Sequence, residues 1–198
     1  LLPKNVIKEY NKTGKYVPVM HKNVSILFCD LIGFTEISGN TEPTVLIDEL
    51  SRVFTQFDQI MEQNGCIRIK TIGDGYMAAC GIDNVIDHAN RIVQAGIEMI
   101  NYLKLQEGNI NWKCRIGINS GQAISGIVGT QRFQFDLMGD DVNIAARVES
   151  NAPPMTTTVT KATTNELDLN KYSIKSLGIK QLKGKGEVNL FSVFNKAV

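Results

Sequence analysis

A hairpin pattern in the first half of the chain is the feature that most constrains its fold. The turn sequence Ile72-Gly73-Asp74-Gly75 separates two strand-like runs, residues 66–71 and residues 76–80. Two such runs joined by a short Gly-containing loop are typical of a β-hairpin. Because a hairpin joins neighbouring antiparallel strands, this part of the chain is predicted to lie in an antiparallel sheet.

Helical and strand patterns alternate on both sides of this hairpin. A buried strand is predicted at residues 24–29, and a helix with apolar residues at helical spacing follows over residues 41–60. After the hairpin, a second helix is predicted over residues 85–103, followed by two strands at residues 112–119 and 123–128. The order β-α-β-β-α-β predicts an α+β fold, with a ferredoxin-like antiparallel sheet and helices flanking it on one face.

The two ends of the chain carry weaker patterns. Residues 1–22 are predicted to form a lead-in helix and connector, and residues 23–198 the main domain. Alternating apolar residues predict a strand at 133–137, and a helix is predicted from Asp140 to about residue 150. The remainder is typical of short strands with one helix.

Composition narrows the class of protein. Of the 198 residues, 43% are hydrophobic, which is enough to bury a full core, and the net charge of +1 gives no basic footprint for nucleic acid. The longest apolar runs are too short to span a bilayer. The four cysteines show no CxxC spacing, and three lie in or beside apolar runs. Reduced, buried thiols in a cytoplasmic domain are expected.

Asp30 and Asp74 are the strongest candidates for chemistry. Asp30 ends the first strand, and Asp74 lies in the turn of the hairpin. Two carboxylates at adjacent strand ends would form a site for hard cations such as Mg²⁺, which prefer oxygen ligands and often accompany phosphates. Such a pair suggests two-metal phosphoryl transfer. Taken singly, Asp30 could be a helix N-cap and Asp74 an ordinary turn residue.

Two further segments could bind phosphate. The segment Gly33-Phe34-Thr35 follows a strand and leads into a helical pattern, so its free backbone N–H groups would suit phosphate oxygens. It is not a P-loop, because no GxxxxGK[ST] sequence occurs in the chain. Lys183 and Lys185 alternate with glycines near the C-terminus, which suits either a phosphate-binding turn or a basic surface turn.

Asn143 and Arg147 lie four residues apart and therefore share one face of the predicted helix. An amide and a guanidinium there could bind a ribose and a developing phosphate charge. A solvated helix face with Arg147 paired to a nearby acid is the alternative.

Four segments of this chain, in order and spacing across residues 22–195, resemble the catalytic domain of class III nucleotide cyclases. These segments are Phe28-Cys29-Asp30-Leu31-Ile32-Gly33-Phe34-Thr35, Lys70-Thr71-Ile72-Gly73-Asp74, Gly139-Asp140-Asp141-Val142-Asn143-Ile144-Ala145-Ala146-Arg147 and Leu182-Lys183-Gly184-Lys185-Gly186. The opening Leu1-Leu2-Pro3 resembles the segment that couples such domains to an upstream regulatory or sensor domain. A cytoplasmic location is expected, either alone or as the cytosolic domain of a larger membrane-associated protein.

The resemblance implies a head-to-tail homodimer with active sites shared between the subunits. Asp30 and Asp74, with the Ile32 carbonyl, would hold two divalent metal ions, Mg²⁺ or Mn²⁺. The other residues that the resemblance implies would come from the partner chain: Lys70 and Asp136 for the purine, Asn143 for the ribose, Arg147 for the α-phosphate and Lys183 for the terminal phosphates. Asp141 departs from the pattern, because smaller polar residues are common there in relatives.

The resemblance also bears on the choice of base. Adenine offers an exocyclic NH₂ donor and ring-nitrogen acceptors, which a carboxylate and an ammonium complement, as Asp136 and Lys70 would. The resemblance implies other residues for guanylyl cyclases of the family. Those enzymes have an acid at the position of Lys70 and a small residue at the position of Asp136. ATP is therefore the expected substrate and cyclic AMP the expected product. A guanylyl cyclase, or an inactive nucleotide-binding regulatory module, is the alternative.

Overall fold

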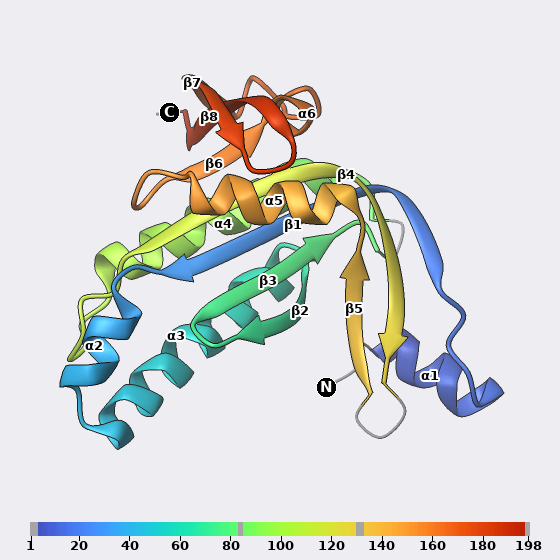
Figure 1. Cartoon of the computed structure of the whole chain (residues 1–198), viewed down its shortest axis with the longest axis horizontal. Helices are drawn as coiled ribbons and strands as arrows, with labels where there is room; N and C mark the ends of the chain where they lie inside the picture. Colours follow the sequence, from blue (N-terminus) through green and yellow to red (C-terminus); the bar gives the residue numbers. More distant parts are fainter. Residues whose placement is uncertain (1–3, 83–84, 130–132, 197–198) are drawn as a thin grey trace.

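The computed structural model describes residues 4–82, 85–129 and 133–196 of the chain. Eight strands form one sheet, and β5 pairs with β4 to the side of the main strand order β2-β3-β1-β4-β6-β8-β7 (Figure 1). The strands are β1 (Val19–Leu31), β2 (Ile67–Ile72), β3 (Gly75–Cys80), β4 (Cys114–Val128), β5 (Gln134–Met138), β6 (Thr157–Thr160), β7 (Tyr172–Leu182) and β8 (Gly186–Asn195).

The first four strands confirm the predicted ferredoxin-like arrangement. Their order β2-β3-β1-β4 places β1 and β3 at the centre, and the neighbouring pairs are antiparallel. The β4–β6 pair is parallel, so the strands that follow extend the sheet beyond the ferredoxin-like unit. The predicted α+β class is therefore correct.

Helices cover both faces of the sheet, whereas the sequence predicted them on one. The two long helices, α3 (Pro43–Gln63) and α4 (His88–Leu105), pack with Leu27 and Cys29 of β1 on one face. Helix α5 (Asp140–Ser150) lies on the opposite face, in front of β1 and β4 in Figure 1. It packs with Val24 and Ile26 of the same strand. Successive side chains of a strand point to opposite faces, so this buried strand needs cover on both.

The expected boundaries of three elements are wrong. Residues 112–119 and 123–128 are not two strands, because β4 continues through Ser120 and Gly121, which pair with Ser25 and Val24 of β1. Strand β1 is longer than predicted, with an irregularity between His21 and Val24. Helix α4 begins at His88 rather than at residue 85.

The short helices are α1 (Lys4–Thr13), α2 (Phe34–Asn40) and α6 (Lys161–Thr164). Helix α1 packs against the domain, with Val6 fully buried and Tyr10 against Phe133. The division of the chain at residue 22 stays a prediction, and β1 runs through that position. The opening Leu1-Leu2-Pro3 segment lies outside the described residues.

The four cysteines are free and buried, as expected. Among the described residues, no helix is long and apolar enough to cross a membrane.

Candidate active site

The carboxylates of Asp30 and Asp74 lie beside each other at one end of the sheet. Asp30 pairs in register with Gly75, the first residue of β3, so the hairpin turn holds Asp74 next to the end of β1. The pKa of Asp30 is raised, first by burial and then by the negative charge of Asp74, while Arg115 acts in the opposite direction. The structure thus brings together the two acids that the sequence selected.

A third carboxylate, which sequence reasoning missed, belongs to the same group. The pKa of Glu149 is raised from 4.5 to about 7, first by burial and then by the negative charges of Asp30 and Asp74. Glu149 lies in α5, two residues after Arg147, but no local pattern shows that this helix packs beside Asp30. Arg115, the missed cation, is opposite Asp30 in the β1–β4 register, which no local pattern reveals.

The donor set of this carboxylate group fits hard divalent cations. Carboxylate and carbonyl oxygens are the ligands that Mg²⁺ prefers, and neighbouring acids that repel each other are stabilised by a cation. The Ile32 backbone N–H donates to the Lys113 carbonyl over 2.8 Å, which fixes the Ile32 peptide beside Asp30. No group of three or more acidic, histidine or cysteine side chains among the described residues has metal-binding geometry. Asp30 and Asp74 are the side chains of this group that could hold a metal ion, together with the Ile32 carbonyl.

The predicted phosphate loop leads from β1 into α2. Gly33 adopts a left-handed backbone with φ of 77° as the N-cap of α2, and no side chain caps this helix. A residue with a Cβ would be strained at that position. Phe34 anchors the loop, because its ring stacks on Trp112 with 6.1 Å between centroids. Thr35 is exposed. The loop is close to Asp30 in the chain and has backbone donors available for an anion.

Asn143 and Arg147 lie on the face of α5 that points away from the sheet. The buried residues of this helix are Val142, Ala145 and Val148, while Asn143 is exposed and Arg147 half-buried. Within the described part of the chain, Arg147 has no carboxylate at ion-pair distance, and neither side chain bonds to Asp30 or Asp74. The exposed helix face of the alternative interpretation is therefore observed, but its ion pair between Arg147 and an acid is not found among the described residues.

Lys70 and Asp136 form an ion pair between β2 and β5. The Lys70 Nζ donates to Asp136 Oδ2 over 2.6 Å, and both side chains are about four-fifths buried, with exposed fractions of 21% and 18%. The other oxygen, Oδ1, accepts from the Leu137 backbone N–H over 2.8 Å. The two residues assigned to the purine thus lie side by side, far apart as they are in sequence.

Lys183 lies exposed in the turn between β7 and β8. The neighbouring Lys185 forms an ion pair with Asp140, the first residue of α5. This pair holds the glycine-rich turn next to the N-terminal end of α5, so Lys183 lies at the same end of the helix as Asn143.

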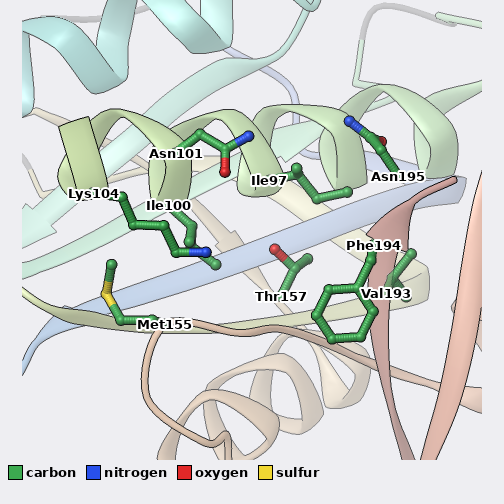
Figure 2. Close-up of a pocket in the computed structure, with 9 residues that line it drawn as sticks. All are labelled: Ile97, Ile100, Asn101, Lys104, Met155, Thr157, Val193, Phe194 and Asn195. Carbon is green, nitrogen blue, oxygen red and sulfur yellow. The ribbon is translucent and has the colours of Figure 1, made fainter. Parts of the chain in front are cut away.

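A separate cavity of about 240 Å³ lies between α4, β6 and β8 (Figure 2). It contains none of the residues selected above. Its lining residues include Ile97 and Ile100 of α4 and Val193 of β8, and Lys104 is the charged residue among those lining it in the described part of the chain. A site for a nucleoside triphosphate needs several cations, so this cavity is not the substrate site. The carboxylates of Asp30 and Asp74 lie elsewhere, where β1 and the β2–β3 hairpin meet.

Comparison with known proteins places the chain in one family. A sequence model described as the "Adenylate and Guanylate cyclase catalytic domain" matches residues 17–195. The chain belongs to this family of cyclase catalytic domains. It is 31% identical to the receptor-type guanylate cyclase gcy-5 of Caenorhabditis elegans over 99% of its length, and 32% identical to guanylyl cyclase C of Homo sapiens over 94%. It spans 18% of the length of each of these relatives.

Solved structures agree with this assignment. The guanylate cyclase domain of RhGC from Catenaria anguillulae, in complex with GTP, superposes with a TM-score of 0.86 at 28% identity, covering 90% of this chain and 100% of that one. A rhodopsin-guanylyl cyclase core "with converted specificity", in complex with ATPαS, gives the same TM-score and identity and covers 90% of this chain and 98% of that one. The adenylyl cyclase CyaB from P. aeruginosa shares the fold, with a TM-score of 0.83 at 23% identity over 92% and 98% of the two chains.

Proposed function

We propose that this domain converts ATP to 3′,5′-cyclic AMP and pyrophosphate in a homodimer whose active sites are shared between two chains. One observation carries this proposal: Asn143 and Arg147 point away from the sheet that bears Asp30 and Asp74. A single chain therefore holds two half-sites that cannot close on the same nucleotide. A second copy, related by a two-fold axis, would supply the missing half to each.

Asp30, Asp74 and the Ile32 carbonyl would hold two divalent metal ions in this site. Such ions neutralise phosphate charge and lower the pKa of a bound hydroxyl group. The backbone donors of Gly33, Phe34 and Thr35 would bind the phosphate oxygens beside them. A bound cation would relieve the mutual repulsion of the three carboxylates in this group, which supports this assignment.

The reaction forms a bond between the ribose 3′-oxygen and the α-phosphorus, breaks the bond from that phosphorus to the pyrophosphate oxygen, and releases the hydroxyl proton. Arg147 would donate to the α-phosphate oxygens, where negative charge is redistributed in the transition state. Stabilisation confined to the transition state raises the rate rather than the affinity. Asn143 would orient the ribose, and Lys183 would bind the departing pyrophosphate.

The Lys70–Asp136 pair supports adenine as the base. Asp136 would accept a hydrogen bond from the exocyclic NH₂ group, and Lys70 would donate to a ring nitrogen. Guanine presents an acceptor and donors in the reverse arrangement, so this pair would leave buried polar groups unmatched.

GTP is the second candidate substrate, because the relatives named above are guanylyl cyclases. Their names describe the relatives rather than this chain, and a converted rhodopsin-guanylyl cyclase was solved with ATPαS. The same fold therefore accommodates either nucleotide, and the base choice depends on local residues.

Product formation from each nucleotide tests the function directly. Purified protein would be given ATP or GTP separately, with Mg²⁺ and then Mn²⁺, beside an Asp30→Ala control. Cyclic AMP from ATP, absent in the control, is the expected result. Cyclic GMP would keep the fold and the chemistry but overturn the assignment of Lys70 and Asp136. No product from either nucleotide at dimer-forming concentrations would favour an inactive nucleotide-binding module.

Shared sites have their own test. Neither an Asp30→Ala chain nor an Arg147→Ala chain should be active alone, whereas a mixture should regain activity. In an equal mixture, half of the dimers carry one intact site, so about a quarter of wild-type activity is expected for a two-fold dimer. A verified heterodimer without activity would contradict the shared site.

The receptor-type names of the relatives suggest the setting of the domain. We infer a cytoplasmic location and an upstream regulatory or sensor domain in the complete protein. Comparing the activity of this domain with that of the full-length protein tests for such a regulatory domain.

A further inference from the structure

Helix α5 presses against β4 at both of its ends. A Cβ on Gly117 would collide with the backbone of Glu149 near the end of the helix, and a Cβ on Gly121 would collide with the carboxylate of Asp141 in its first turn. Both glycines lie on the same face of β4, four residues apart. Backbone or carboxylate contacts of this kind leave the helix little freedom to shift along the strand.

The contact at the N-terminal end is made by hydrogen bonds to Asp141. One carboxylate oxygen, Oδ2, accepts from the Gln122 backbone N–H over 2.8 Å. The other, Oδ1, accepts from Asn119 Nδ2 over 3.1 Å, and the same amide group donates to the Asp141 backbone carbonyl over 3.1 Å. Three interactions therefore join one residue of the helix to two residues of the strand.

Asn119 is itself held in place on the buried side. It is 2% exposed, and its Oδ1 accepts from the Thr160 hydroxyl over 2.7 Å. Because all of its side-chain atoms have fixed partners, Asn119 presents its amide to Asp141 in one orientation. A buried and fully satisfied polar contact of this kind specifies geometry as well as stability.

Asp141 therefore differs from an ordinary acid in the first turn of a helix, because its carboxylate bonds to the neighbouring strand β4. Such an acid usually interacts with the positive end of its own helix. The preceding acid, Asp140, is exposed and pairs with Lys185 across the surface. Asp141 instead points toward β4, in the space that Gly121 leaves open.

We propose that Asp141 is a positioning residue, which fixes the first turn of α5 on β4 and so sets Asn143 and Arg147 at the angle that the partner subunit's nucleotide requires. Asn143 follows Asp141 by two residues and Arg147 by six, on the same rigid helix. A small misplacement of catalytic groups lowers the rate by about 10²-fold without removing any of them. This inference rests on the proposed function, because it assigns Asp141 to the half-site on α5.

The matched variants are Asp141→Ala, Asp141→Asn and, as a control, Asp48→Ala. Asp141→Ala removes both carboxylate contacts, and kcat should fall about 10- to 100-fold with a smaller change in KM, since geometry in the transition state is what is lost. Asp141→Asn keeps an acceptor for the Gln122 N–H but sets an amide against the Asn119 amide, so an intermediate kcat is expected. Asp48 is an exposed acid on α3, and its replacement should leave kcat unchanged.

Gly121 provides a second route to the same contact. Gly121→Ala would displace the Asp141 carboxylate and should reproduce the loss in kcat. In the double variant Gly121→Ala/Asp141→Ala the collision is absent, so it should be no worse than Asp141→Ala alone. Fully additive losses would show that Gly121 matters for another reason, and would contradict the proposed contact.

Mixed dimers separate positioning from a general loss of structure. An Asp141→Ala chain has an impaired α5 half-site but intact Asp30 and Asp74, so mixing it with an Asp30→Ala chain should restore activity. Mixing it with an Arg147→Ala chain should not, because both chains then have impaired α5 half-sites. A merely unfolded or non-dimerising Asp141→Ala chain would restore activity in neither mixture.

The reference mixture of Asp30→Ala with Arg147→Ala shows whether a negative result contradicts the role of Asp141 alone or the shared active site as well. If this reference is active but Asp141→Ala fails to complement Asp30→Ala, the role of Asp141 is wrong while the shared site stands. An Asp141→Ala homodimer as active as the wild type would also overturn that role. If the reference mixture is inactive in a verified heterodimer, the shared site is wrong and the proposal for Asp141 falls with it.

Discussion

Charged side chains gather in two regions of this domain, and the two differ in how their charge is balanced. Around Asp30, three carboxylates lie near one another with Arg115 as the nearby cation, and the pKa values of Asp30 and Glu149 are raised. Between β2 and β5, by contrast, Lys70 and Asp136 neutralise each other over 2.6 Å.

The difference indicates what each region needs from a ligand. The carboxylate group has excess negative charge, so binding a cation relieves repulsion that exists in the free protein. The Lys70–Asp136 pair has no excess charge, so a purine must share or replace an interaction already made. The first region should therefore dominate catalysis and metal binding, and the second should decide only between substrates.

The largest effect should come from breaking the carboxylate group. Asp74→Ala removes one of the two acids that would hold metal ions, and metal-assisted charge stabilisation contributes several kcal/mol. Product formation should fall by a factor on the order of 10²–10⁴. Initial rates measured at saturating Mg²⁺ and nucleotide check this, with Asp48→Ala as the control. Near-normal rates in Asp74→Ala would remove Asp74 from the site.

Replacing the neutral pair should change the substrate rather than abolish the chemistry. A Lys70→Glu/Asp136→Cys variant presents an acid where the ammonium stood, which suits guanine. The ratio of kcat/KM for ATP over GTP should fall by about 10²–10³, because mismatched buried polar groups discriminate strongly. Parallel assays with each nucleotide measure that ratio. Unchanged ATP turnover would contradict the base assignment.

The fold was accessible from the sequence wherever its signals are local. The hairpin around Asp74 and the helical spacing on both sides of it predicted a ferredoxin-like antiparallel sheet, and the ends of β1 and of that hairpin meet as expected. The placement of α5 on the opposite face was not predicted. Periodicity shows that a helix has a buried side, but it does not show which face of a sheet that side covers.

The candidate site shows the same limit. The residues alone selected Asp30, Asp74, Asn143 and Arg147, whereas roles for Lys70 and Asp136 came only from the family resemblance. Arg115 was missed because its position opposite Asp30 depends on the register of β1 with β4. Strand register is set by contacts across the sheet, which a single stretch of sequence does not display.

Mg²⁺ should stabilise the folded protein by binding to the carboxylate group around Asp30 and not to the Lys70–Asp136 pair. Ligand present at 100 times its dissociation constant stabilises the folded state by about 2.7 kcal/mol. For a domain of this size that corresponds to a rise in Tm of about 5–10 °C. Mg²⁺ should raise the Tm of the wild type and of Lys70→Met, but not that of Asp30→Ala. Thermal unfolding with and without Mg²⁺ measures this, and an equal rise in all three proteins would place the metal elsewhere.

The raised pKa of Glu149 predicts a pH-dependent stability. Its pKa in the folded protein is about 7, against 4.5 ordinarily, so the fold favours the neutral form. Stability should therefore decrease as pH rises from about 4.5 to 7, and Glu149→Gln should escape that loss. With allowance for solvent screening, the free energy of unfolding of Glu149→Gln should exceed that of the wild type by about 1–2 kcal/mol at pH 8. Denaturant unfolding without metal should show the difference vanishing near pH 4.

The smallest effect should be the coupling between Lys70 and Asp136. A double-mutant cycle with Lys70→Met and Asp136→Asn measures their interaction free energy by denaturant unfolding. Exposed ion pairs usually contribute about 0.2–1 kcal/mol. A coupling in that range, although both side chains here are about four-fifths buried, would let an incoming purine take over one partner at little cost. A coupling of about 3 kcal/mol or more would be typical of a buried pair that resists opening. In that case the pair would be structural, and the base would have to be recognised by other residues.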